Sequence, residues 1–217
     1  MNELRYTLLS DGSSDRALIP LLTWLLQEKG ISSAIQGQWA DLRRLTDPPK
    51  RLSERISSSV YLYPCDLLFI HRDAEKESLE KRVAEIRHAL AAAKQGEQMP
   101  RAVCVVPVRM QEAWLLFDEQ AIRHAAGNPQ GKEPLNLPHI STVESHADPK
   151  EALYSALRTV SGLQGRRLRS FKMSIAVQRV AERIDDFSPL RQLSAFRHLE
   201  HELAAIVDQY GWNDVVS

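Results

Sequence analysis

Acidic side chains that follow apolar runs are the residues of this sequence best suited to chemistry. They are Asp11, Asp73, Glu75 and Glu112. Alternate residues of an extended segment point the same way, so the carboxylates of Asp73 and Glu75 can face one ion. Acids that meet in a fold cannot all stay ionised unless protons or a cation neutralise them. Mg²⁺, or Mn²⁺ in its place, is the simplest cation, because hard divalent ions take oxygen ligands and act on phosphate substrates.

The elements that would bring these acids together are strands of a parallel sheet. Strand-like runs cover 5–9, 33–39, 65–70 and 102–108, and helical patterns cover 15–29, 49–62, 78–94 and 112–126. Strands that alternate with helices predict an α/β fold, with a parallel sheet flanked by helices. The carboxyl ends of parallel strands share one edge, so we expect Asp11, Asp73 and Glu75 to converge there as catalytic residues and metal ligands. Glu112 would be a fourth metal ligand.

The rest of the chain predicts a helical extension. Prolines and a glycine crowd 128–149, which is typical of an irregular connection. Helical patterns follow at 149–160, 170–184 and 189–210. We therefore expect a core over 1–127 and an extension over 128–217 that packs on it as part of a single domain.

Each acidic position also has an ordinary structural interpretation. Asp11 suits a turn with a helix cap. Asp73 and Glu75 could simply open a solvated run of charges, and Glu112 could favour the positive end of a helix. His71 is a secondary candidate that could accept a proton or contact phosphate, although a lone histidine at the end of a strand is more often structural. These alternatives stay open at the level of sequence.

Two segments resemble the motifs of the Toprim fold, which occurs in topoisomerases, primases and nucleases of the overcoming-lysogenization-defect type. They are the residues 8–15, followed by an apolar helix, and the residues 68–75. In that fold an acid after the first strand acts in acid/base or metal chemistry, and an Asp-x-Asp after a later strand holds Mg²⁺. The resemblance carries these roles to Asp11, and to Asp73 with Glu75. Asp11 stands where Glu is usual, and Glu75 stands where the second Asp is usual.

The segment 107–118 further resembles the Glu-Ala-Trp helix of a Toprim-like bacterial family of unknown function. This resemblance implies an association with genome defence. We expect a Mg²⁺-dependent phosphoryl-transfer enzyme, a nuclease that acts on DNA or RNA. The alternative is a non-catalytic interaction protein that keeps the scaffold and partners an ATPase; the exchanged acids and the zero net charge motivate it.

Basic residues offer a route to nucleic acid, although the zero net charge means that no whole-molecule field draws the protein onto it. The densest cluster consists of Arg166, Arg167, Arg169 and Lys172. Guanidinium groups bind phosphate by paired hydrogen bonds, so this cluster is a candidate nucleic-acid contact. A solvated helix start is the other interpretation.

The cysteines and the motifs absent from the sequence bear on the cellular location and on the other kinds of enzyme that the sequence disfavours. Cys65 and Cys104 lie in or beside apolar runs and are expected to be reduced core thiols, which suits the cytoplasm. The sequence shows no leader and no apolar stretch of membrane-spanning length, so we expect no membrane contact. A phosphate-binding Gly-x-x-x-x-Gly-Lys loop and a Gly-x-Ser-x-Gly elbow are both absent from the sequence.

Overall fold

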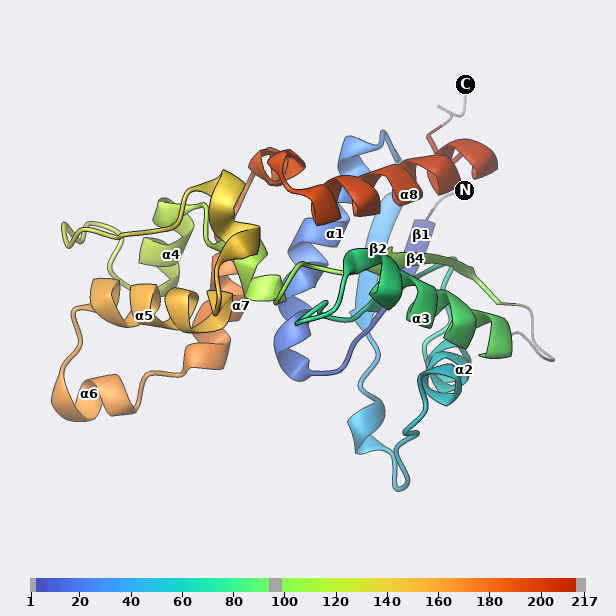
Figure 1. Cartoon of the computed structure of the whole chain (residues 1–217), viewed down its shortest axis with the longest axis horizontal. Coiled ribbons are helices and arrows are strands. Elements are labelled where there is room, and N and C mark those ends of the chain that lie inside the picture. Colours follow the sequence, from blue (N-terminus) through green and yellow to red (C-terminus); the bar gives the residue numbers. More distant parts are fainter. Residues whose placement is uncertain (1–2, 94–98, 214–217) are drawn as a thin grey trace.

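A four-stranded parallel sheet organises the computed structural model, which describes residues 3–93 and 99–213 (Figure 1). The strands are β1 (Glu3–Leu9), β2 (Ala34–Trp39), β3 (Leu67–His71) and β4 (Arg101–Val105). Their order across the sheet is β2-β1-β3-β4, and every pairing is parallel. The predicted α/β class is confirmed: a parallel sheet flanked by helices, with further helices after it.

Helices follow the strands and continue beyond the sheet. The α-helices are α1 (Leu18–Glu28), α2 (Leu52–Leu62), α3 (Leu79–Ala93), α4 (Glu119–Ala125), α5 (Pro149–Ser161), α6 (Gly165–Arg169), α7 (Met173–Arg183) and α8 (Ser194–Tyr210). Short 3₁₀ helices are η1 (Ser13–Ala17), η2 (Leu42–Arg44), η3 (Gln111–Leu115), η4 (Ile140–Ser145) and η5 (Ser188–Gln192). None of these helices has the length and apolar character needed to cross a membrane.

Both faces of the sheet are buried, as the apolar sequence of β3 predicts. Successive side chains of a strand point to opposite faces. Leu67 and Phe69 accordingly join one apolar cluster, which includes α1 and α8, while Leu68 and Ile70 join a second one with residues of α2 and α3. The sheet is therefore the middle layer of three, and its carboxyl edge is left for side chains of the connecting loops.

A close approach between β1 and β2 depends on a glycine. The Tyr6 hydroxyl bonds the Ile19 carbonyl (3.0 Å) and the Thr23 hydroxyl (2.7 Å), which directs the ring toward α1. Gly37 pairs with Tyr6 in the register of the two strands, and a Cβ at Gly37 would collide with the Tyr6 ring. Glycine is needed here because the ring occupies the space of a side chain.

The larger apolar cluster continues from the sheet into the helices after η3. Trp114 meets Phe196 edge to face, and the ring centroids are 5.7 Å apart. The ring centroids of Trp24 and Phe187 are also 5.7 Å apart. Helix α7 packs against η1, and α8 packs against β4. In Figure 1, α4 to α7 gather to one side of the sheet, and α8 returns across it.

The continuous helix predicted over 112–126 is wrong. The segment divides into η3 and α4, because the Asp118 side chain accepts a hydrogen bond from the Ala121 N–H (2.9 Å) and starts a new helix. The helix predicted over 15–29 likewise opens with the 3₁₀ turn η1. Both segments begin with a 3₁₀ turn that carries an acidic side chain at the edge of the sheet.

Candidate functional site

Loops that follow β3 and β4 are joined to each other at the carboxyl edge of the sheet. The N–H groups of Arg72, Ala74 and Glu75 donate to the carbonyls of Val105, Pro107 and Arg109, at distances of 3.0–3.2 Å. This ladder continues the pairing of the two strands beyond their ends. The Gln111 N–H then donates to Asp73 Oδ1 (2.9 Å), which places the start of η3 beside the acid that follows β3.

His71 stands between two carboxylates in the interior of this edge. Its Nδ1 bonds the Val105 carbonyl (3.0 Å), and because a carbonyl can only accept, the proton lies on Nδ1. Nε2 lies 3.5 Å from Asp73 Oδ1 and 4.0 Å from Asp15 Oδ2, and the imidazole is only 2% exposed. His71, a secondary candidate by sequence, therefore occupies the centre of the site.

Asp15 is a site residue that sequence reasoning missed. Its buried carboxylate accepts hydrogen bonds from the Gly12 N–H (2.8 Å), the Ser14 hydroxyl (3.0 Å) and the Gln111 side-chain amide (2.8 Å). Asp15 follows Asp11 within the same turn, where an acid is the ordinary helix cap. As the third residue of η1, Asp15 accepts from the N–H of the N-cap Gly12, as the acid of a capping box does, so the local sequence held no signal that separates the two roles.

Glu112 is 3% exposed and completes a cluster of negative charge. Burial raises the pKa of Glu112 above its ordinary value, the charges of Asp73 and Asp15 add to the rise, and Lys150 opposes it. Burial also raises the pKa of Asp73, with further contributions from Asp15 and Glu75. We call Asp15, His71, Asp73 and Glu112 the buried cluster; three of these side chains are buried, and that of Asp73 is 29% exposed.

Asp11 has a different environment from the one that we expected. Its half-exposed carboxylate pairs with Arg55 Nη1 and lies 3.4 Å from Arg72 Nε. Burial alone would raise the pKa of Asp11, but the ion pairs with Arg55 and Arg72 outweigh burial and lower it. The two arginines already balance the charge of Asp11 and lower its pKa, whereas the pKa values of Asp73 and Glu112 are raised.

Glu75 does not follow the alternation that the sequence suggested. Its backbone is left-handed, with φ of 55°, so the rule for extended residues does not carry over from Asp73 to Glu75. Arg109, whose carbonyl accepts from the Glu75 N–H, is also left-handed, with φ of 66°. The Glu75 side chain is exposed and lines a separate 460 Å³ cavity together with Arg82 and Arg109.

The predicted nucleic-acid cluster lies on another part of the molecule. Arg166, Arg167 and Arg169 belong to α6, and Lys172 precedes α7; all four side chains are exposed. Figure 1 shows α6 at the outer margin of the helical part, away from the sheet. Arg167 and Lys172 line a 340 Å³ cavity there.

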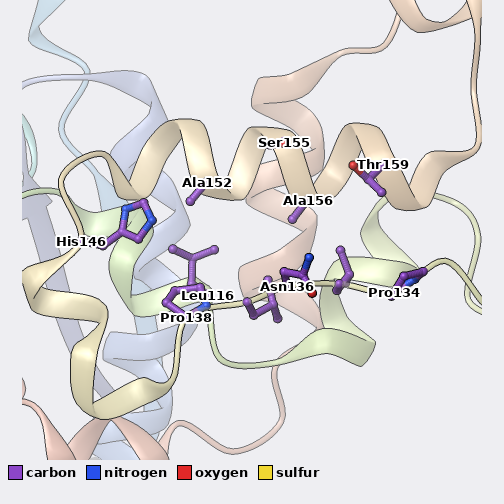
Figure 2. A pocket seen from close by; sticks show the side chains of 11 residues that line it. Leu116, Pro134, Asn136, Pro138, His146, Ala152, Ser155, Ala156 and Thr159 are labelled. Atoms are coloured by element: carbon purple, nitrogen blue, oxygen red, sulfur yellow. The ribbon is translucent and has the colours of Figure 1, made fainter.

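A hollow of 730 Å³ is also distinct from the buried cluster. It lies between α5 and the connection over 134–138, with His146 at one end (Figure 2). Leu116, Ala152 and Ala156 give it an apolar wall, and no acidic side chain lines it. This hollow therefore lacks the groups that the proposed chemistry needs.

The buried cluster does not form a closed cage for a metal ion. Within residues 3–93 and 99–213, no three His, Cys, Asp or Glu side chains are grouped so that they could hold one metal ion. Mg²⁺ usually keeps several waters and needs only one or two carboxylates, so Asp73 with Asp15 is the donor pair to test. The chain matches no protein-family model, no curated protein and no solved structure in our comparisons.

Replacing Glu112 with Gln is expected to stabilise the metal-free protein at high pH. The raised pKa of Glu112 means that the folded state holds its proton more tightly than the unfolded state. The resulting penalty is absent below the unfolded value of about 4.3 and grows as the pH rises toward the folded pKa. Urea unfolding in EDTA should find Glu112→Gln more stable than wild type at about pH 8 and equal to it at about pH 4.

Glu200→Gln is a control of opposite sign. Burial alone would raise the pKa of Glu200, but ion pairs with Lys29 (2.9 Å) and Arg191 (3.0 Å) outweigh it and lower the pKa. Its stabilising contribution is present above the unfolded value and lost as the pH falls through the folded pKa. Glu200→Gln should therefore be less stable than wild type at high pH. A Glu112→Gln protein with that same behaviour would contradict the charge assignment.

Proposed function

We propose that this protein is a Mg²⁺-dependent phosphoryl-transfer enzyme, a nuclease that cleaves DNA or RNA in the cytoplasm as part of genome defence. The observation that carries the proposal is the buried cluster, in which Asp15, Asp73 and Glu112 gather negative charge that His71 and Lys150 oppose. A hard divalent cation would relieve that charge. The Toprim-like motifs at 8–15 and 68–75 support the same chemistry.

The residues of the buried cluster suit separate roles. Asp73 and Asp15 would hold the ion, which when bound would polarise a phosphoryl oxygen and offset charge on the reacting phosphate. Glu112 keeps its proton to a higher pH than an exposed glutamate, which suits donation of that proton to the leaving oxygen. His71, with Nδ1 fixed by the Val105 carbonyl, presents Nε2 as a group that can accept a proton or contact phosphate.

Asp73→Asn tests the proposed reaction. With Mg²⁺ or Mn²⁺ and labelled DNA and RNA, we expect the cleavage rate to fall by about 10²–10³-fold, because one carboxylate of the donor pair becomes neutral. Glu77→Gln is the matched control: it neutralises an exposed acid in the same loop, one that pairs with Lys81. Cleavage that persists in Asp73→Asn at the wild-type rate would refute the role of Asp73.

A non-catalytic interaction protein that partners an ATPase is the second candidate. The arginine pairs of Asp11 favour it, because an acid already neutralised by Arg55 and Arg72 has less need of a metal ion. Titration calorimetry of the wild-type protein with Mg²⁺ and Mn²⁺ separates the candidates. Heat of binding that disappears in Asp73→Asn supports the enzyme, whereas neither binding nor cleavage in the wild type supports the interaction protein.

A further inference from the structure

A 180 Å³ cavity adjoins Asp11 at the ends of β1 and β2. The side chains that matter in it are Ser10, Asp11, Trp39, Arg43, Lys50 and Arg55. Figure 1 shows the connection between β2 and α2, which supplies Arg43 and Lys50, projecting beyond the sheet. The cavity thus shares Asp11 and the sheet edge with the candidate site, but its lining is basic.

Cations outnumber acids in this lining. Arg55 is fixed in place, since Nη1 pairs with Asp11 and Nη2 donates to the Ser10 carbonyl (2.6 Å). Lys50 is exposed at the rim. Three basic residues, Arg43, Lys50 and Arg55, line the cavity together with one acid, Asp11. The lining therefore presents net positive charge to an incoming anion.

Trp39 forms a fixed wall that holds Arg43. The indole N–H donates to the Ser10 hydroxyl (2.8 Å), and the Arg43 guanidinium lies 4.8 Å from the centroid of the ring. Arg43 uses Nε for its bond to Asp41 (3.0 Å), which leaves its terminal nitrogens for a ligand. A guanidinium held by a ring loses little freedom when it binds a phosphate, and its planar fork matches phosphate oxygens.

We propose that this cavity binds a phosphate of the single nucleic-acid strand whose reacting phosphate lies at the buried cluster. The inference rests on the proposed function and narrows its nucleic-acid substrate to a single strand. Basic side chains beside an aromatic ring are the usual means of following an unpaired strand. Arg43 and Lys50 are then binding residues that act outside the reacting centre.

Fluorescence anisotropy of a short labelled single strand, DNA or RNA, measures how tightly the protein binds it. The titration is made in EDTA, where metal-dependent cleavage cannot occur. Arg43→Gln and Lys50→Gln are each expected to weaken binding about tenfold, as the loss of a charged hydrogen bond does. Each should also reduce the slope of log affinity against log salt by about 0.7, the value for one phosphate contact on a single strand.

The chain offers a matched control for each variant. Arg44→Gln is the control for Arg43→Gln. It removes the same charge and an ion pair with the same acid, because Arg44 Nε lies 3.0 Å from Asp41 Oδ2, but Arg44 does not line the cavity. Arg51→Gln removes the charge next to Lys50, where Arg51 pairs loosely with Glu54 (3.8 Å). These controls should change affinity less than about twofold, as exposed ion pairs contribute little.

Two results would overturn the cavity proposal: wild-type protein that does not bind the strand, or controls that weaken binding as much as Arg43→Gln and Lys50→Gln. Failure of the proposed function is separate from both. Cleavage unaffected by Asp73→Asn, together with the expected binding pattern, would remove the reaction and keep the cavity. Cleavage lost in Asp73→Asn, with no difference between cavity variants and controls, would keep the reaction and remove the cavity.

Discussion

Asp15→Asn is expected to lower the rate of nucleic-acid cleavage by about 10²–10⁴-fold, the range for removal of a group that takes part in the chemistry. The Asp15 carboxylate is buried, accepts three hydrogen bonds and contributes to the raised pKa values of Asp73 and Glu112. Single-turnover cleavage with Mg²⁺ measures the effect. Loss of this carboxylate would remove both a donor for the ion and much of the negative charge that attracts it.

Asp11→Asn makes the same chemical change four residues earlier and is the comparison that decides the assignment. Arg55 and Arg72 already neutralise Asp11, so its loss should slow cleavage at least tenfold less than the loss of Asp15. The opposite order would restore Asp11 as the principal acid of the first motif.

The stability of Asp15→Asn must be measured so that a loss of cleavage is not mistaken for a loss of folding. In Asp15→Asn the Gln111 side-chain amide would no longer donate to a charged carboxylate. The loss of this charged hydrogen bond should lower the free energy of unfolding by about 1.5–3 kcal/mol. Cleavage rates should therefore be compared at a temperature where circular dichroism shows both variants folded. Gln111→Leu, which removes the same hydrogen bond but keeps the carboxylate, should share the loss of stability and lose less activity.

Trp114→Ala is expected to lower the free energy of unfolding by about 3–5 kcal/mol, because it empties a large volume of the core. Trp114 is fully buried and meets Phe196 of α8 edge to face. This contact ties η3, which carries Gln111 and Glu112, to the helix that covers the sheet. Urea unfolding followed by circular dichroism provides the measurement.

A double-mutant cycle with Phe196→Ala should reveal a coupling of about 0.5–1.5 kcal/mol between the two rings. Trp114→Phe should cost less than Trp114→Ala, because it keeps a ring and removes a buried indole N–H that has no partner within the described residues. Tyr61→Ala, at an aromatic side chain that is 78% exposed, is the surface control and should change stability by less than about 0.5 kcal/mol. Equal effects at Trp114 and Tyr61 would contradict the proposed packing.

The strands and their acidic ends could be predicted because the signals are local. β3 is a continuous apolar run up to His71, a pattern typical of a strand covered on both faces. Glu112 was expected just past a strand that ends at 108, whereas β4 ends at Val105 and Glu112 lies in η3. Segment ends were less predictable, since Asp118 begins a new helix where the helical pattern itself runs on.

The membership of the buried cluster could not be predicted, because contacts between distant segments decide it. Gln111 reaches Asp15 across 96 residues of sequence and Asp73 across 38. Arg55, from α2, draws Asp11 into an ion pair, and no local pattern links those two residues. Burial then distinguishes acids that look alike in sequence: Asp15 and Glu112 are enclosed, and Asp11 and Glu75 are not.

By itself, the sequence determined a parallel sheet with acids at its carboxyl edge, because hydrophobic periodicity and residue order along the chain specify where strands run and end. The tertiary structure alone decided which acids share the buried cluster. The left-handed backbone at Glu75, the arginines beside Asp11 and the Gln111 amide on Asp15 arise only when the loops after different strands meet. Desolvation and charge act through space, so the chemistry of this edge depends on neighbours that the order of residues does not reveal.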